Sequence, residues 1–318
     1  MNSVLKNIVT AGLFLPIAVV VGLILFFGIA SDAFFTLRNL TAVSGQASTL
    51  LIACLGATFV ILMGSIDLSV GAIVLLVGAI TVKAINAFGL GTDAVLVGLV
   101  AGAFLGWING AIFAFGRIPS FVVTLGSLSV FTGIAWQILE GRAIRFDALS
   151  FEELAIGQLI PRFPNIALIA IIIWAVMVAV CFSTRFGRSM YIIGGGEAVA
   201  LTAGIAVRRH KIMAFMLSGA TAGIAGALAV ARLGSAGPTL GQDLLLNTLA
   251  AIVVGGTSLS GGIGGVHRTM LGVLIIVLLD NGLNLMGVNQ YAQMMVKGAV
   301  VIIAVLVSQD RGKAIVVK

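Results

Sequence analysis

Two short segments rich in glycine and serine interrupt the apolar sequence and carry most of its polar chemistry. Residues 64–71 read Gly-Ser-Ile-Asp-Leu-Ser-Val-Gly, which places Asp67 between two serines. Residues 255–262 read Gly-Gly-Thr-Ser-Leu-Ser-Gly-Gly and supply hydroxyl groups without a carboxylate. Hydroxyl and carboxylate groups form hydrogen bonds with polar solutes, so we expect these two segments to contact a polar ligand.

Asp67 admits two interpretations that are compatible with each other. A carboxylate at membrane depth is costly and needs partners. In the first interpretation, Asp67 and Ser65 cap the N-terminus of the next helix by accepting its free backbone N–H groups. In the second, the segment breaks a membrane helix so that its exposed backbone faces a polar pathway.

Motifs for catalysis by this chain alone are missing from the sequence. It has no G-x-x-x-x-G-K-[ST] phosphate-binding loop and no H-E-x-x-H motif. Its only histidines are His210 and His267, and its only cysteines, Cys54 and Cys181, lie in apolar runs. We therefore expect no enzyme activity, no metal and no cofactor, with ATP hydrolysis left to a separate protein.

Composition places the two segments in a membrane protein. Of the 318 residues, 60% are hydrophobic and 9% are charged, and the mean hydropathy is +1.21. A soluble domain has about 45–50% apolar and about 25% charged residues. The composition excludes an ordinary cytoplasmic enzyme, a disordered protein and a nucleic-acid binder, so the net charge of +7 is expected to lie in cytoplasmic loops.

Ten apolar stretches approach or reach the length of about 20 residues that spans a bilayer. They lie at about residues 10–30, 41–64, 67–87, 94–116, 121–138, 165–183, 212–231, 248–264, 269–287 and 291–308. We predict an all-α, polytopic membrane protein with about ten transmembrane helices, forming a single transmembrane domain over residues 1–318.

The positions of the basic residues predict the orientation. Residues 184–211 contain five lysines and arginines but only one acid, Glu197, so we expect this loop to be cytoplasmic. Counting spans outward from it places both termini in the cytoplasm. The longest outer segment, residues 139–164, is expected to lie along the membrane surface.

An internal repeat determines the expected architecture. The two glycine segments agree at four of eight positions, and downstream the Asn-Gly pair at Asn109 corresponds to the pair at Asn281. The halves, residues 1–150 and 151–318, would each have five spans, and an odd number makes the repeat inverted. Transporters of this plan place their pathway between the halves, beside interrupted helices.

Glycines at helical spacing predict close contact between helices. Gly102, Gly106 and Gly110 lie on one face of a helix, and Gly219 and Gly223 form a second such motif. Small residues at these positions allow membrane helices to approach closely. Packing therefore explains them better than a role in a pathway.

The loop at residues 184–211 also has a pattern of its own. Its glycines bracket a short predicted helix at Glu197–Thr202. It could be an ordinary solvated loop, or an amphipathic helix parallel to the membrane that contacts a peripheral motor. For the second case we assign ATPase coupling to Gly187, Arg188, Gly195, Glu197 and Gly204.

At these residues the sequence resembles the ribose/xylose-type permease subunits of bacterial ABC importers for monosaccharides. The likeness runs from about residue 40 to the C-terminus and lies in the two glycine segments and in five further motifs. These are Asn109-Gly110, residues 118–126, Phe186-Gly-Arg188, Gly204-Ile205 and residues 281–288. The resemblance implies a bacterial inner-membrane location, two permease chains, two cytoplasmic ABC ATPase domains and a periplasmic sugar-binding protein.

The chain departs from the family pattern near the second glycine segment. The family commonly has acids at the positions of Leu245 and Asn247, and it often has Asn at Gly196 and Gly at Arg268. The exact sugar, and whether the two permease chains are identical or different, stay open.

We therefore expect a permease subunit that moves a monosaccharide or related polyol from periplasm to cytoplasm. The residues expected to line its pathway or hold its broken helices are Asp67, Ser69, Asn109, Thr257, Ser258, Asn281 and Asn284. A branched-chain amino acid or nucleoside ABC permease is the nearest alternative. An ion-coupled secondary transporter is disfavoured, because Asp67 and Asp280 are too few intramembrane acids for a proton-coupled carrier.

Overall fold

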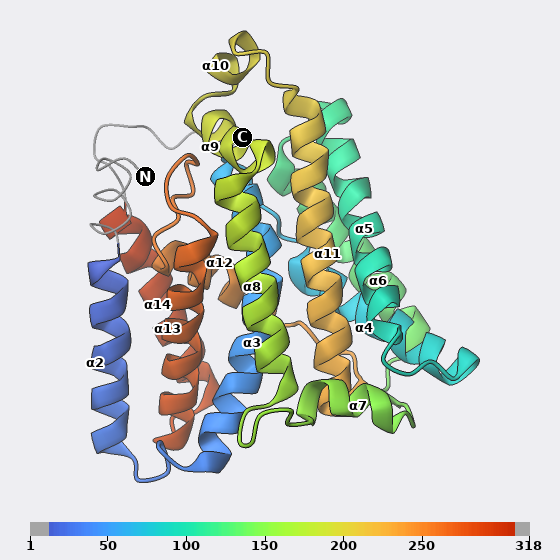
Figure 1. The fold of residues 1–318 in the computed structure, drawn as a ribbon, viewed down its shortest axis with the longest axis vertical. Coiled ribbons are helices and arrows are strands. Elements are labelled where there is room, and N and C mark those ends of the chain that lie inside the picture. The colour runs from blue at the N-terminus through green and yellow to red at the C-terminus, as the bar shows by residue number, and fades with distance from the viewer. Residues whose placement is uncertain (1–12, 309–318) are drawn as a thin grey trace.

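A computed structural model describes residues 13–308 of the chain, which form a bundle of helices (Figure 1). Seven helices in this range are long and apolar enough to cross a membrane. They are α3 (Leu37–Leu62), α4 (Val70–Phe88), α5 (Ala94–Gly116), α6 (Ser120–Leu139), α8 (Asn165–Ser183), α11 (Val207–Leu233) and α13 (Val266–Leu285). Three further apolar helices are α2 (Phe14–Ala30), α12 (Leu244–Val254) and α14 (Gln290–Ser308). The apolar stretches of these three helices are shorter, and that of α14 is Gln290–Leu306.

The all-α, polytopic class is confirmed. Each of the ten predicted stretches overlaps one of the ten apolar helices, and seven of these helices reach spanning length. Helix α12 has 11 residues, a length of about 16 Å, because the chain leaves the helix at the second glycine segment.

The remaining elements lie at the two ends of the bundle (Figure 1). Helices α9 (Arg185–Gly195) and α10 (Glu197–Thr202) lie at one end, and α10 has the bounds predicted for it. At the other end lie α7 (Leu149–Ile156) and a two-stranded antiparallel sheet of β1 (Ile144–Arg145) and β2 (Ser235–Ala236). The segment predicted to lie along the surface, residues 139–164, thus forms β1 and α7.

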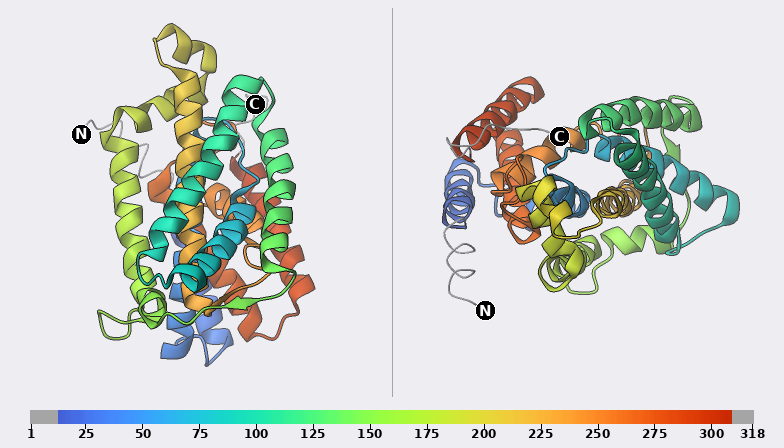
Figure 2. Two further views of the ribbon diagram at one scale, coloured as in Figure 1. Left: turned by 90° about the vertical axis from the view of Figure 1, so that its right-hand side faces the viewer. Right: turned by 90° about the horizontal axis from the view of Figure 1, so that it is seen from above.

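Helices α3, α4 and α11 are largely buried, whereas α5, α6 and α8 lie on the outside of the bundle (Figure 2). The three outer helices expose apolar side chains. The two predicted glycine motifs, one on α5 and one on α11, pack against each other. A Cβ at Gly102 of α5 would overlap the carbonyl oxygen of Gly219 on α11, and the reverse also holds. The predicted close packing is therefore confirmed.

Helix α4 begins inside the bundle rather than at its surface. The chain turns back after α3 at Gly64, whose φ of +76° favours glycine. Ser69 and Val70 are fully buried, and Ser69 belongs to a network that reaches Ser218, close to the midpoint of the 27-residue helix α11.

The segment before α12 approaches the start of α4 closely. Gly71 and Gly241 face each other so tightly that a Cβ on either would overlap the carbonyl oxygen of the other. The turn that leads into α12 therefore lies directly against the start of α4.

Candidate functional site

Asp67 is the centre of a buried hydrogen-bond network at the start of α4. Its Oδ1 accepts hydrogen bonds from the backbone N–H of Ser69 at 3.0 Å and from the Ser69 hydroxyl at 2.6 Å. Its Oδ2 accepts from the hydroxyl of Ser218 on α11 at 2.8 Å. The amide of Asn109 on α5 donates to the Ser69 hydroxyl at 2.8 Å, and Ser127 on α6 donates to Asn109 Oδ1 at 2.6 Å. Three predicted site residues, Asp67, Ser69 and Asn109, therefore meet.

The network gives hydroxyl and backbone partners to a carboxylate that is cut off from water. Asp67, Ser69, Asn109 and Ser218 are all buried. Buried polar groups require such partners, since an unpaired one costs free energy. Sequence reasoning missed Ser218 and Ser127, because a single serine on an apolar helix has no spacing that distinguishes it.

The expected capping of α4 by Asp67 and Ser65 is wrong. The residue at the N-cap position is Ser69, and no side chain caps this helix by a hydrogen bond. Asp67 instead accepts from the N–H two residues further on, which is the geometry of an Asx-turn. The N–H of Ile66 donates to the Ser120 hydroxyl of α6 at 3.1 Å, so residues 64–69 form a turn that is anchored within the bundle.

Thr257 stabilises the second glycine segment. Its buried hydroxyl accepts a hydrogen bond from the N–H of Gly265 at 3.1 Å. The Ser258 hydroxyl lies nearer the surface, 2.8 Å from that of Ser260. Thr257 and Ser258 thus shape the loop between α12 and α13, and the Asp67 network uses other hydroxyl groups.

The two glycine segments touch each other through their backbones. The N–H of Gly262 donates to the carbonyl oxygen of Leu62, the last residue of α3, at 2.8 Å. A Cβ at Gly64 would lie 3.2 Å from the carbonyl oxygen of Ser260. Segments almost 200 residues apart in the chain therefore lie side by side.

Asn281 and Asn284 lie away from these segments, toward the α7 end of the bundle. The side-chain amides of Asn281 on α13 and Asn39 on α3 donate to each other at 2.7 and 3.0 Å. Asn284 is exposed. The structure therefore divides the predicted site residues between the interior and one end, and Asn39 is a partner that sequence reasoning missed.

A buried ion pair lies beside Asn281. The ammonium of Lys297 on α14 is 3.1 Å from the carboxylate of Asp280 on α13, and both side chains are largely buried. Lys297 therefore has an acidic partner within the bundle. Such intramembrane pairs mark functional regions of membrane proteins.

The residues assigned to ATPase coupling gather at the opposite end, on α9, α10 and their flanking turns (Figure 1). Gly187 allows a sharp corner between α8 and α9, because a Cβ there would overlap the carbonyl of Cys181. Glu197 begins α10 and forms an ion pair with Lys211 of α11 at 3.0 Å. The Lys211 ammonium also lies 4.5 Å from the centroid of the Phe113 ring.

The other three coupling residues lie toward the outside. Arg188 is exposed, and its guanidinium is 3.5 Å from the carbonyl oxygen of Ser183. A Cβ at Gly195 would meet open space. Gly204 follows α10 with a φ of +74°, which favours glycine. These residues are accessible to a partner, and their role in coupling stays a prediction.

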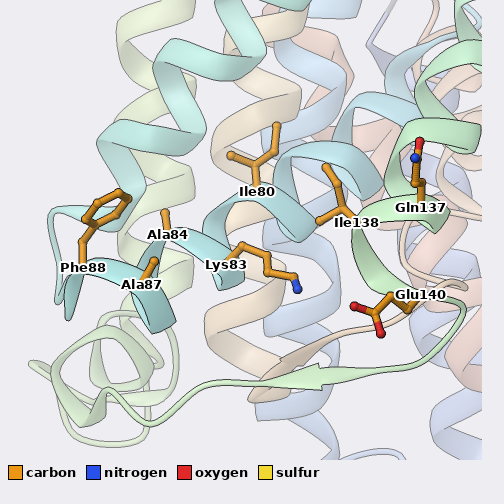
Figure 3. A pocket seen from close by; sticks show the side chains of 8 residues that line it. All are labelled: Ile80, Lys83, Ala84, Ala87, Phe88, Gln137, Ile138 and Glu140. Carbon is orange, nitrogen blue, oxygen red and sulfur yellow. The ribbon is translucent and has the colours of Figure 1, made fainter.

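An open pocket of about 560 Å³ lies between α4 and α6 near the α7 end (Figure 3). Its walls are mainly apolar, with Lys83 and Glu140 at its polar side. None of the predicted pathway residues lines it; its lining residues are Ile80, Lys83, Ala84, Ala87, Phe88, Gln137, Ile138 and Glu140. The Asp67 network is therefore separate from this pocket.

Comparison with known proteins finds transport proteins over most of the chain. The family described as branched-chain amino acid transport system / permease component matches residues 39–305. The ribose import permease protein RbsC of Escherichia coli (strain K12) is 38% identical over 285 residues, which are 88% of this chain and 88% of that protein. The protein of the same name from Bacillus subtilis (strain 168) is 38% identical over 293 residues, 91% and 90% of the two chains.

A relative named for a different sugar is almost as similar. The D-allose transport system permease protein AlsC of Escherichia coli (strain K12) is 34% identical over 302 residues, 92% of this chain and 90% of that protein. No solved structure matches this chain. With the family matched from residue 39 to 305 and these identities sustained along nearly the whole length, this chain belongs to the family of transport-system permease components, as a ribose-type permease subunit of an ABC importer.

Proposed function

We propose that this chain is the membrane-spanning subunit of an ABC importer that carries a monosaccharide or related polyol from periplasm to cytoplasm. The observation that supports this best is the Asp67 network, where hydroxyl and amide groups surround a helix start inside the bundle. A sugar forms hydrogen bonds with such groups without requiring charge. The sugar names of the relatives, ribose and allose, agree with this choice.

A branched-chain amino acid is the second candidate, because the family description names it. A zwitterionic amino acid would need groups that complement both of its charges. In the interior network both oxygens of Asp67 already accept hydrogen bonds from serine groups, which favours an uncharged polyol.

The pathway in this proposal runs from the α7 end to the α9–α10 end of the bundle. The α9–α10 end carries Arg185, Arg188, Arg208 and Arg209, so the positive-inside rule makes it cytoplasmic. The described ends of α2 and α14 point toward that side as well (Figure 1). The termini themselves, predicted to be cytoplasmic, lie outside the described residues.

In this proposal an inverted repeat relates two halves, residues 1–150 and 151–318. Each half contains one of the two glycine segments. The contact between these segments supports a pathway at the junction of the halves. Two cytoplasmic ABC ATPase domains, a periplasmic sugar-binding protein and a second permease chain complete the proposed importer. Residues 184–211 would contact the ATPase.

The test is uptake into proteoliposomes that contain this chain together with its ATPase and its sugar-binding protein. We expect uptake of labelled ribose, allose or a related polyol that requires both ATP and the binding protein. Leucine should neither enter nor compete. Uptake driven by an ion gradient in the absence of ATP would contradict the proposal and favour a secondary transporter.

A further inference from the structure

The end of α9 approaches the backbone of the second glycine segment and that of Leu62, two residues before the first segment. A Cβ at Gly194 would overlap the carbonyl oxygen of Leu62 and the amide nitrogen of Gly262. A Cβ at Gly261 would lie 2.9 Å from the Cα of Gly194 and 2.7 Å from the amide nitrogen of Gly64. Three segments distant in the sequence therefore meet at one point, which we call the glycine junction: Leu62, Gly64, Gly194, Gly261 and Gly262.

Side chains of α9 also contact α3 and the loop that follows the second glycine segment. The Phe186 ring packs against that of Phe59 on α3, with 5.5 Å between ring centroids. The Tyr191 hydroxyl donates to the carbonyl of Gly264 at 2.9 Å, and burial raises the pKa of this hydroxyl, which keeps its proton. Helix α9 is thus fixed to both sides of the junction.

The junction lies between the cytoplasmic elements of the proposed importer and its interior network. Three residues after Gly194, α10 begins with Glu197 and its ion pair to Lys211. On the other side, Asp67 and the buried start of α4 follow Gly64 by only a few residues. The loop that contains Gly262 leads directly into α13.

We propose that Gly194 is the positioning residue through which a movement of α9 and α10 displaces both glycine segments together. The proposal rests on the proposed function, in which an ATPase moves these helices. Backbone contacts contain no side-chain torsions that could absorb a displacement, so a shift of about 1–2 Å at α9 passes to the starts of α4 and α13. A side chain at Gly194 would separate α9 from the junction without changing the exposed face of α10.

The test compares Gly194→Ala with Gly196→Ala in the complete importer reconstituted with its ATPase and binding protein. At Gly196 a Cβ would meet only the Val199 side chain, at an ordinary 3.5 Å. We expect Gly194→Ala to assemble with its ATPase and to keep basal ATP hydrolysis. Sugar transported per ATP should fall about fivefold or more, and stimulation of hydrolysis by loaded binding protein should fall with it.

Gly196→Ala should couple hydrolysis to uptake as the unchanged protein does. Equal coupling in both variants, with the unchanged importer active, would overturn the role of Gly194 and leave the proposed function standing. An unchanged importer without ATP-dependent sugar uptake would instead refute the proposed function itself.

A distance measurement decides the matter if Gly194→Ala does not assemble. Spin labels on Gly196→Cys and Ile263→Cys report the separation of α9 from the second segment, and labels on Ile263→Cys and Phe115→Cys report movement relative to α5. Ile263 and Phe115 are exposed, whereas the native cysteines are buried. ATP should change the second separation and leave the first unchanged. A change in the first separation, or no change in either, would overturn the proposal.

Discussion

Asp67 shows how this molecule holds a polar group within an apolar bundle. Three donors from two serines reach its carboxylate, and hydrogen bonds to a charged group contribute about 1.5–3 kcal/mol each. The serine hydroxyls can rotate and can donate as well as accept. Such a network can exchange partners with the hydroxyls of a passing sugar without a large movement of the backbone.

This geometry separates the role of the Asp67 charge from that of its hydrogen bonds. Asp67→Asn keeps one acceptor oxygen for Ser69, and the Ser218 hydroxyl can turn to accept from the new amide. Asp67→Leu leaves the buried donors unpaired, at a cost of about 1–3 kcal/mol for each group. We expect Asp67→Asn to retain folding and much of the uptake, whereas Asp67→Leu loses uptake first and thermal stability second.

Both variants should be measured by sugar uptake in proteoliposomes and by thermal unfolding in detergent. If Asp67→Asn were as inactive as Asp67→Leu while remaining folded, the negative charge itself would be required. That outcome would contradict a network that acts by hydrogen bonds and would favour an ion-coupled carrier.

Between elements, contact through glycine recurs wherever two helices must approach closely. Helices α5 and α11 meet along Gly102, Gly106 and Gly219, where the backbone of one helix touches that of the other. In lipid, such packing replaces the hydrophobic effect as the force that associates helices. A similar close backbone contact joins Gly71 at the start of α4 to Gly241 just before α12.

Substitution of Gly102 by alanine should therefore destabilise the folded protein, although it adds only one methyl group. The new methyl group of Gly102→Ala would overlap the Gly219 backbone, and overpacking of this kind costs about 1–3 kcal/mol. Gly126→Ala on α6 is the matched control, since a Cβ there meets nothing within 4 Å. We expect thermal unfolding in detergent to show a lower Tm for Gly102→Ala and an equal or higher Tm for Gly126→Ala. Equal Tm values would show that α5 and α11 can separate freely.

Helix α10 allows a test of coupling that is independent of the glycine junction. Glu197→Lys breaks the ion pair with Lys211 and reverses the charge at the start of α10. We expect the protein to insert and the ATPase to hydrolyse ATP while uptake falls. The double variant Glu197→Lys with Lys211→Glu restores the ion pair but keeps the reversed charge at the start of α10. It should recover uptake only if coupling requires the ion pair rather than the negative charge of Glu197. Normal uptake with Glu197→Lys would contradict the coupling role of α10.

Across the whole molecule, the features that sequence could predict are those encoded in consecutive residues. The bounds of α10, Glu197–Thr202, follow from flanking glycines, and the apolar helices follow from runs of hydrophobic residues. Contacts between residues far apart in the chain could not be predicted from the sequence. The Asn39–Asn281 pair joins residues 242 apart, and Ser218 is a single serine in a long helix.

The division of the pathway residues between the interior and the α7 end has a consequence for binding. Asp67, Ser69 and Asn109 satisfy one another in the buried network, and Asn281 is satisfied by Asn39. A sugar that entered would have to compete with these internal hydrogen bonds. The chain alone therefore offers it few free partners.

Free sugar should bind the isolated permease weakly, because a pathway that held it tightly would not release it inward. A ligand can shift a two-state bundle only through its differential affinity for the two states, so the driving force must come from the binding protein outside and ATP inside. We expect a Kd above about 1 mM for ribose or allose, which corresponds to no more than about 4 kcal/mol of binding free energy. Titration calorimetry on the purified subunit in nanodiscs, with leucine as the comparison ligand, measures this directly. Micromolar binding of the sugar without partner proteins would mean that this chain selects its own substrate, as a self-sufficient carrier does.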